Sequence, residues 1–217
     1  MGLTSTTIKR IGLVSLGSVG RRHFRLLKSL RPELEVVLVR SGKGGSRPEE
    51  SLAAATVASV ELALSKGIDA AIIASPATFH LQHAIHLLLA DIPVLIEKPL
   101  SHNLENIDVL QELACLTEAP VVLGYVLRYA QDLNFFRAML KAGSVGDLTK
   151  VSINCSTYLP DWRPGQDYLL TASANADLGG GVLLELSHEL DYANWLFGPF
   201  QSIEATALNS GTLNLDV

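Results

Sequence analysis

A strand, a glycine-rich turn and a helix follow one another near the start of the chain, and this order constrains the fold more than any other feature. Residues 8–15 are mostly apolar and predict a buried strand, and residues 19–30 predict a helix that ends before Pro32. The N–H groups that such a helix leaves unpaired at its start favour anions. The turn between the two elements is therefore a candidate site for the pyrophosphate of a dinucleotide.

The turn itself reads Ser15-Leu16-Gly17-Ser18-Val19-Gly20. In the full dinucleotide pattern the first glycine makes the tight turn, the second lets the backbone approach the pyrophosphate, and the third lets the helix pack closely. Gly17 and Gly20 take the second and third roles, and Ser15, a mild change, stands in place of the first. An ordinary glycine turn in an α/β protein is the alternative. The residues expected to contact a cofactor here are Ser15, Gly17, Ser18, Val19 and Gly20.

Arg40 ends the next apolar run, residues 34–39, and stands twenty residues past Gly20. An acidic residue at this place usually binds the ribose 2′-hydroxyl of NAD, whereas an arginine suits the 2′-phosphate of NADP. Arg40, with Ser41 and Lys43 close behind it, therefore favours NADP over NAD as the cofactor. The alternative is an arginine that is merely solvated at the end of a strand.

Strands and helices continue to alternate as far as residue 123. Further strands are expected at 70–74, 94–96 and 121–123, helices at 78–90 and 103–116, and a weaker helical stretch up to residue 63. This alternation predicts right-handed crossovers and an α/β fold with a doubly wound parallel sheet. Residues 1–125 are thus expected to form a Rossmann dinucleotide-binding domain.

Residues 126–217 show a different pattern. A helix is expected at 132–141, a strand of alternating polarity at 149–158, a loop at 159–181 and a helix at 182–197, followed by strands at 202–207 and 211–217. Alternating polarity is typical of a sheet that is covered on one face only. These residues are expected to form part of a second α/β domain.

Composition and charge exclude several classes of protein. The chain has 17 basic and 22 acidic side chains, a net charge of -5 and no basic run, which argues against nucleic-acid or membrane-surface partners. No apolar stretch approaches the roughly 18 residues of a membrane helix, and residues 1–10 do not resemble a secretory signal. Cys115 and Cys155 lie far apart and are expected to be reduced thiols. The expected location is the cytoplasm.

A metal site is not expected. His80, His83 and His86 are closely spaced candidate ligands, but the third points well round the helix from the first two. No carboxylate or cysteine completes the set, and hydride transfer needs no metal.

A Glu97-Lys98-Pro99 triplet follows the expected strand at 94–96, at the edge where open α/β sheets bind ligands. The glycine turn, the segment from Ala74 to His80, this triplet and the run Gly179-Gly180-Gly181 before a histidine-bearing helix occur in that order. The chain thereby resembles the Gfo/Idh/MocA family of NAD(P)-dependent oxidoreductases. The resemblance implies a C-terminal domain with an open, largely antiparallel sheet that covers the substrate and supports a homo-oligomer. By that measure the second domain is incomplete and the chain is truncated at its C-terminus.

The resemblance also implies roles for particular residues. Lys98 becomes the catalytic lysine, while Ser75, Pro76, His80 and Glu97 lie with it at the cofactor. His188 and Glu185 become candidate acid–base groups, although Leu184 stands where many members have an aspartate. The second half looks like a subgroup that acts on sugars of surface polysaccharides. Its expected contacts with a sugar or nucleotide-sugar substrate are Arg128, Tyr129, Trp162, Arg163, Tyr168 and Asp191.

The expected reaction is hydride transfer between the nicotinamide and a hydroxyl-bearing carbon of the substrate. Lys98 or His188 would exchange the hydroxyl proton, and the lysine would stabilise the developing oxyanion. A non-catalytic NAD(P)-binding sensor on the same fold is the main alternative, and an inactive fragment is another.

Overall fold

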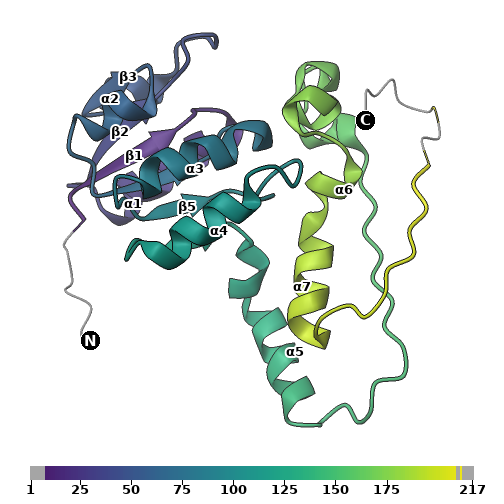
Figure 1. Cartoon of the computed structure of the whole chain (residues 1–217). Helices are drawn as coiled ribbons and strands as arrows, with labels where there is room; N and C mark the ends of the chain where they lie inside the picture. Colours follow the sequence, from purple (N-terminus) through teal and green to yellow (C-terminus); the bar gives the residue numbers. More distant parts are fainter. Residues whose placement is uncertain (1–7, 209–210, 212–217) are drawn as a thin grey trace. The chain divides into compact units, whose positions relative to one another are not determined.

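The computed structural model describes residues 8–208 and residue 211 of the 217-residue chain (Figure 1). The chain divides into two compact units, Met1–Gly124 and Tyr125–Val217. No helix among the described residues is long and apolar enough to cross a membrane.

The first unit is built on a six-stranded sheet in the order β3-β2-β1-β4-β5-β6, and every neighbouring pair is parallel. This order and direction are those of the Rossmann fold, which confirms the expected fold class of this part of the chain. The strands are β1 (Arg10–Val14), β2 (Glu35–Val39), β3 (Ala55–Val57), β4 (Ala70–Ile73), β5 (Val94–Ile96) and β6 (Val121–Leu123). Strand β3 lies in the stretch expected to be helical, so that expectation is wrong there. A strand of three residues is too short to show an alternation with a period of two.

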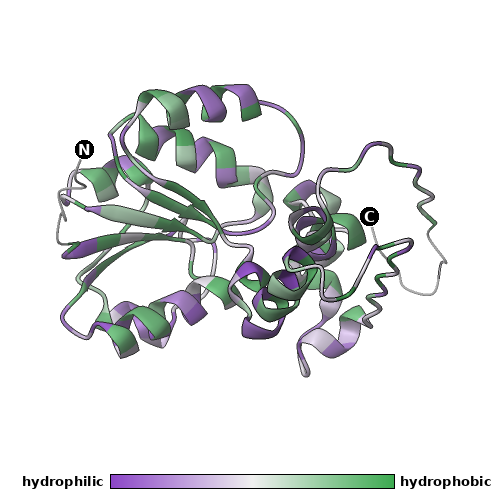
Figure 2. Ribbon diagram, turned by 90° about the horizontal axis from the view of Figure 1, so that it is seen from below, coloured by the Kyte–Doolittle hydropathy of each residue, from purple (hydrophilic) through white to green (hydrophobic). Residues whose placement is uncertain are grey.

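Helices cover both faces of this sheet, as Figure 2 shows. Within β2, Val37 and Val39 pack on one face and Val36 and Leu38 on the other, so each face has its own core. Phe24 of helix α1 (Ser18–Leu30) fills the second core. The first core is closed by apolar residues of α2 (Val60–Leu64), α3 (His80–Leu88) and α4 (Ile107–Leu116). Short 3-10 turns, η1 (Pro48–Leu52) and η2 (Ala77–Phe79), complete the unit.

The secondary structure assigned to the described residues of the second unit is all helical. It begins with η3 (Val126–Tyr129) and α5 (Gln131–Lys141), and it ends with α6 (Val182–Glu185) and α7 (Ser187–Phe197). Between them lie four single turns, η4 (Leu159–Trp162), η5 (Tyr168–Leu170), η6 (Ala172–Ala174) and η7 (Ala176–Leu178). The single helix expected at 182–197 is wrong, because Leu186 leaves the helical conformation (φ -99°, ψ 24°) and divides it in two.

The open sheet expected in the second unit is not found among the described residues. Residues 149–158 and 202–207 are without assigned strand structure, and the strand expected at 211–217 lies outside the described residues except for residue 211. A strand needs a hydrogen-bonded neighbour, and no described segment of this unit pairs with either stretch. Val151 and Ile153 accordingly remain 44% and 37% exposed, although their alternation is that of a half-covered strand.

Candidate functional site

The carboxyl ends of neighbouring strands gather most of the expected cofactor residues at one edge of the sheet. Ser15, which follows β1, donates its backbone N–H to Val39 of β2 (2.9 Å), and Ala74, which follows β4, donates to Val14 of β1 (3.0 Å). Glu97, which follows β5, donates to Ile73 of β4 (2.9 Å). The glycine turn and residues 40, 75, 76, 97 and 98 therefore follow the strand ends at this edge, where open α/β sheets bind ligands.

The two glycines of the turn differ in how closely the protein packs around them. A Cβ on Gly20 would clash with the carbonyl oxygen of Ser15 and lie 3.1 Å from its carbonyl carbon, so helix α1 can approach β1 only with glycine here. Gly17, by contrast, is exposed, and a Cβ there would meet only the Ser15 hydroxyl at 4.0 Å. Exposed residues at the start of a 13-residue helix leave N–H groups available to an anion. The turn fits a pyrophosphate.

Ser15 adopts a left-handed conformation (φ 76°) that glycine takes without strain. Left-handed backbone costs other residues about 1–2 kcal/mol. The serine is therefore a less mild replacement for the first glycine than its small size suggests, although the turn keeps the conformation that the pattern requires.

Glu97 is held by a histidine that sequence reasoning missed. His23 of α1 places Nε2 2.6 Å from Oε1 of Glu97, and both side chains are largely buried. Burial is the largest single influence and acts to raise the pKa of Glu97, but the hydrogen bond and charge of His23 together with the N–H and charge of Lys98 outweigh it, so the pKa lies below its ordinary value. The other carboxylate oxygen accepts the backbone N–H of Lys98 (3.3 Å). A carboxylate is thus fixed directly beside the lysine, and the 74 residues that separate His23 from Glu97 explain why no local pattern revealed the pair.

His80 holds two loops of the site together. Its side chain is 1% exposed, with Nδ1 2.8 Å from the carbonyl oxygen of Pro99 and Nε2 2.8 Å from that of Ser75. One ring nitrogen thus faces the loop after β4 and the other faces the loop of Lys98. With both nitrogens next to backbone carbonyls, His80 positions these two loops, and its expected contact with the cofactor stays a prediction. Nearby, His83 places Nδ1 3.2 Å from the Ser75 hydroxyl.

We expect the protein to lose stability between pH 6.5 and 5.5 through these two histidines. Burial is the main cause that lowers the pKa of both His80 and His83 below the ordinary value of 6.5. The unfolded chain therefore binds protons more readily than the folded one, and stability present above pH 6.5 is lost as the pH falls. The slope is at most about 1.4 kcal/mol per pH unit for each histidine.

Urea denaturation at pH 7.5, 6.5 and 5.5 measures this slope. H80Q should be less stable at pH 7.5 and should show a shallower slope, while Q82A, at an exposed position of α3, should keep the slope of the parent protein. Equal free energies of unfolding at pH 7.5 and 5.5 would contradict the expectation. Carboxylates with lowered pKa, such as Glu97, lose their contribution only at lower pH.

In the second unit two expected substrate contacts bind each other. Arg128 donates from Nε and Nη2 to the two carboxylate oxygens of Asp191, at 2.9 and 2.7 Å. This hydrogen-bonded pair raises the pKa of Arg128, and Asp191 is only 10% exposed. The pair therefore ties η3 to α7, with the charges of both residues balanced.

The other expected residues of the second unit are spread over several elements. Glu185 ends α6 whereas His188 lies in the first turn of α7, so the break at Leu186 removes the continuous helical spacing expected between them. The rings of His188 and Tyr125 are nearly perpendicular, with ring centroids 5.9 Å apart. Tyr129 is 76% exposed, and Trp162, Arg163 and Tyr168 lie in or beside η4 and η5.

The described residues contain no group of three or more histidine, cysteine or acidic side chains arranged to hold a metal ion. Cys115 and Cys155 are both free thiols and exposed.

Comparison with protein families agrees with the Rossmann fold of the first unit. The model of the oxidoreductase family with an NAD-binding Rossmann fold matches residues 9–125. The chain belongs to the Gfo/Idh/MocA family. The C-terminal domain model of the same family matches residues 134–214, which covers most of the second unit.

Individual relatives differ in what they act on. An uncharacterized oxidoreductase of Synechocystis (sll0816) is 32% identical over 67% of this chain and 38% of its own length. An inositol 2-dehydrogenase of Leifsonia xyli is 26% identical over 93% of this chain and 58% of its own length. The chain thus spans less than two thirds of the length of these relatives. In structure, the WlbA dehydrogenase of Bordetella pertussis, solved with NADH and UDP-GlcNAcA, has a TM-score of 0.70 at 19% identity, over 88% of this chain and 59% of that one.

Proposed function

We propose that this protein is an NAD(P)-dependent dehydrogenase or reductase that acts on a hydroxyl-bearing carbon of a sugar or nucleotide-sugar. The observation that supports it best is the position of Lys98 at the end of β5, on the same sheet edge as the open glycine turn after β1. Relatives named as inositol dehydrogenases and a structural neighbour solved with a nucleotide-sugar support this substrate class. A role in surface-polysaccharide synthesis and a homo-oligomeric state belong to the same proposal.

We assign the following roles to individual residues in this reaction. Backbone N–H groups of the turn from Ser15 to Gly20 bind the pyrophosphate, and Ser75 and Pro76 border the nicotinamide. When bound, the nicotinamide accepts or supplies the hydride. Lys98 hydrogen-bonds the substrate oxygen and exchanges its proton, with Glu97 fixed beside it. His188 and Glu185 are the acid–base candidates of the second unit, and Tyr129, Trp162, Arg163 and Tyr168 are candidates for sugar contacts.

We further propose NADP as the preferred cofactor. Arg40 stands at the end of β2, where a guanidinium can bind a 2′-phosphate, and Ser41 and Lys43 follow it in an exposed loop. The matching family model describes an NAD-binding Rossmann fold and does not distinguish NAD from NADP. The proposed preference for NADP therefore rests on Arg40, Ser41 and Lys43.

Absorbance at 340 nm tests the proposed reaction. The purified protein is incubated with NAD or NADP and, in separate wells, with myo-inositol, scyllo-inositol and UDP-sugars including UDP-GlcNAcA. We expect reduction of the dinucleotide with at least one of these substrates, faster with NADP than with NAD. Binding of the dinucleotide without turnover on any substrate would instead support the alternative of a cofactor-binding sensor.

A further inference from the structure

We propose that Glu50 is an internal competitor for Arg40 that weakens the binding of a 2′-phosphate. The pair of Arg40 and Glu50, and not Arg40 alone, would then set the preference between NAD and NADP. This inference rests on the proposed function, because it takes the adenosine end of a dinucleotide to lie at the carboxyl end of β2.

Arg40 lies at the place that this orientation requires. Its backbone N–H donates to Val57 of β3 (2.9 Å), and the residue before it, Val39, accepts from Ser15 of the glycine turn. Arg40 is therefore next to the strand that carries the turn. A dinucleotide whose pyrophosphate sits on the turn extends its ribose toward the end of β2.

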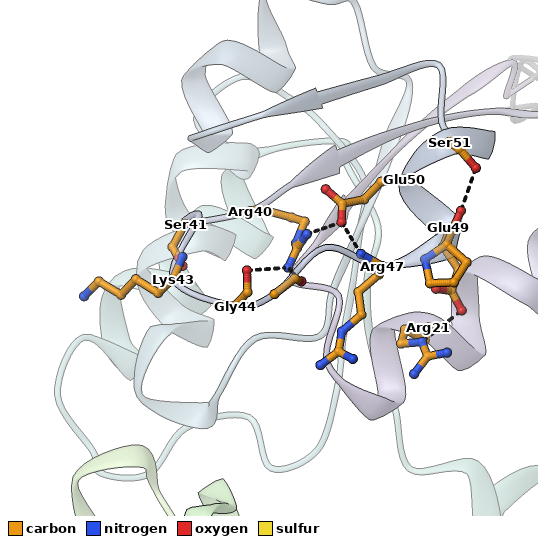
Figure 3. A network of polar contacts seen from close by, with 11 residues as sticks. Arg21, Arg40, Ser41, Lys43, Gly44, Arg47, Glu49, Glu50 and Ser51 are labelled. Atoms are coloured by element: carbon orange, nitrogen blue, oxygen red, sulfur yellow. Dashed lines mark hydrogen bonds and ion pairs between the residues drawn. The ribbon is translucent and has the colours of Figure 1, made fainter.

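The guanidinium of Arg40 is already engaged within the protein, as Figure 3 shows. Its Nη1 forms a short ion pair with Oε1 of Glu50. Its Nη2 donates to the carbonyl oxygen of Gly45 at 2.8 Å and, more weakly, to that of Gly44 at 3.4 Å. The side chain is only 12% exposed. A phosphate that binds Arg40 must therefore share it with a carboxylate.

Glu50 is held firmly in this position. It lies in the one-turn helix η1, and its Oε1 also accepts the backbone N–H of Arg47, which precedes that turn, at 2.5 Å. The N–H of Arg47, followed by the hydrogen bond from Arg40, keeps the pKa of Glu50 below its ordinary value. The carboxylate is therefore ionised near neutral pH.

A fixed negative charge at this point discriminates between the two dinucleotides. The 2′-phosphate of NADP must share the Arg40 guanidinium with the Glu50 carboxylate, whereas the neutral 2′-hydroxyl of NAD does not compete for that charge. Glu50 thus opposes the preference for NADP that Arg40 creates, and it leaves the affinity for NAD largely unchanged.

The variant E50Q isolates this charge. Glutamine keeps an oxygen that can accept the N–H of Arg47 and a polar group next to Arg40, but it removes the negative charge. Dissociation constants for NADPH and NADH are measured by titrating the fluorescence of the reduced nicotinamide, without any substrate. We expect E50Q to bind NADPH about tenfold more tightly, with the dissociation constant for NADH changed less than about twofold.

Two further variants make the result specific. In the double variant R40Q/E50Q the selective gain should disappear when compared with R40Q alone, because the competition needs the guanidinium. E35Q removes the same charge from the exposed ion pair with Arg10 at the opposite end of β2, and it should leave both dissociation constants unchanged.

Three results would overturn the inference. The first is that E50Q changes the two dissociation constants equally, and the second is that E50Q weakens the binding of NADPH. The third is that the selective gain of E50Q persists in the R40Q background. If the parent protein binds both nucleotides, these results leave the proposed function standing. Binding of neither nucleotide by the parent protein or its variants would overturn the proposed function together with the inference.

Discussion

Replacing Lys98 with methionine is expected to lower kcat by about 10²- to 10⁴-fold while the dissociation constant for NADPH changes less than about threefold. Methionine keeps most of the length of the side chain and removes the ammonium group. Without it, the substrate oxygen loses both a proton donor or acceptor and the positive charge that stabilises an oxyanion. The cofactor contacts expected on the glycine turn lie between β1 and α1, whereas Lys98 follows β5.

Lys66→Met is the matched control for this substitution. Lys66 is exposed and lies in the loop that enters β4, at the opposite edge of the sheet from Lys98. The control should retain the parent kcat and KM. Initial rates and fluorescence titrations on both variants separate loss of chemistry from loss of binding. K98M with more than a tenth of the parent kcat would remove the lysine from the catalytic role.

The interpretation of the first unit from sequence succeeded where the signal is local. A strand, turn and helix that adjoin in the chain also adjoin in space, so the turn from Ser15 to Gly20 could be recognised from residue types alone. The parallel sheet followed from alternating elements. Strand β3, with three residues, carried too little pattern to be recognised.

Contacts between distant residues could not be predicted in this way. His23 and Glu97 meet only because α1 and the end of β5 reach the same sheet edge. His80 contacts two loops through backbone carbonyls, and because every residue has a carbonyl, the sequence does not indicate which ones it contacts. Glu50 likewise changes what Arg40 can do. An arginine at the end of β2 suggests a phosphate site, but its partner determines how much charge remains for a ligand.

The second unit shows the limit of a periodic pattern. The alternation at residues 149–158 describes which side chains would share a face of a sheet, yet a strand also needs neighbours to pair its N–H and C=O groups. Those neighbours are not among the described residues of this unit. The break at Leu186 is equally invisible, because the residues around it have ordinary helical propensities.

Replacing Gly20 with alanine is expected to reduce stability, whereas replacing Gly17 with alanine is expected to reduce the affinity for NADPH. G20A should lower the free energy of unfolding by about 2–4 kcal/mol, because its methyl group clashes with the Ser15 backbone and helix α1 must move away from β1. G17A should change stability by less than about 0.5 kcal/mol. Gly17 has a φ of -69°, which alanine adopts readily, and apart from its chain neighbours no residue comes closer than 4.0 Å to the new methyl group.

G17A should nevertheless weaken NADPH about 10- to 100-fold, because its methyl group occupies the space through which the pyrophosphate approaches the backbone. Urea denaturation and nicotinamide fluorescence measure the two quantities on the same samples. A loss of affinity without a loss of stability in G17A can come only from a ligand at this surface, since the folded protein itself is unaffected. G17A that binds NADPH as tightly as the parent protein would place the dinucleotide elsewhere.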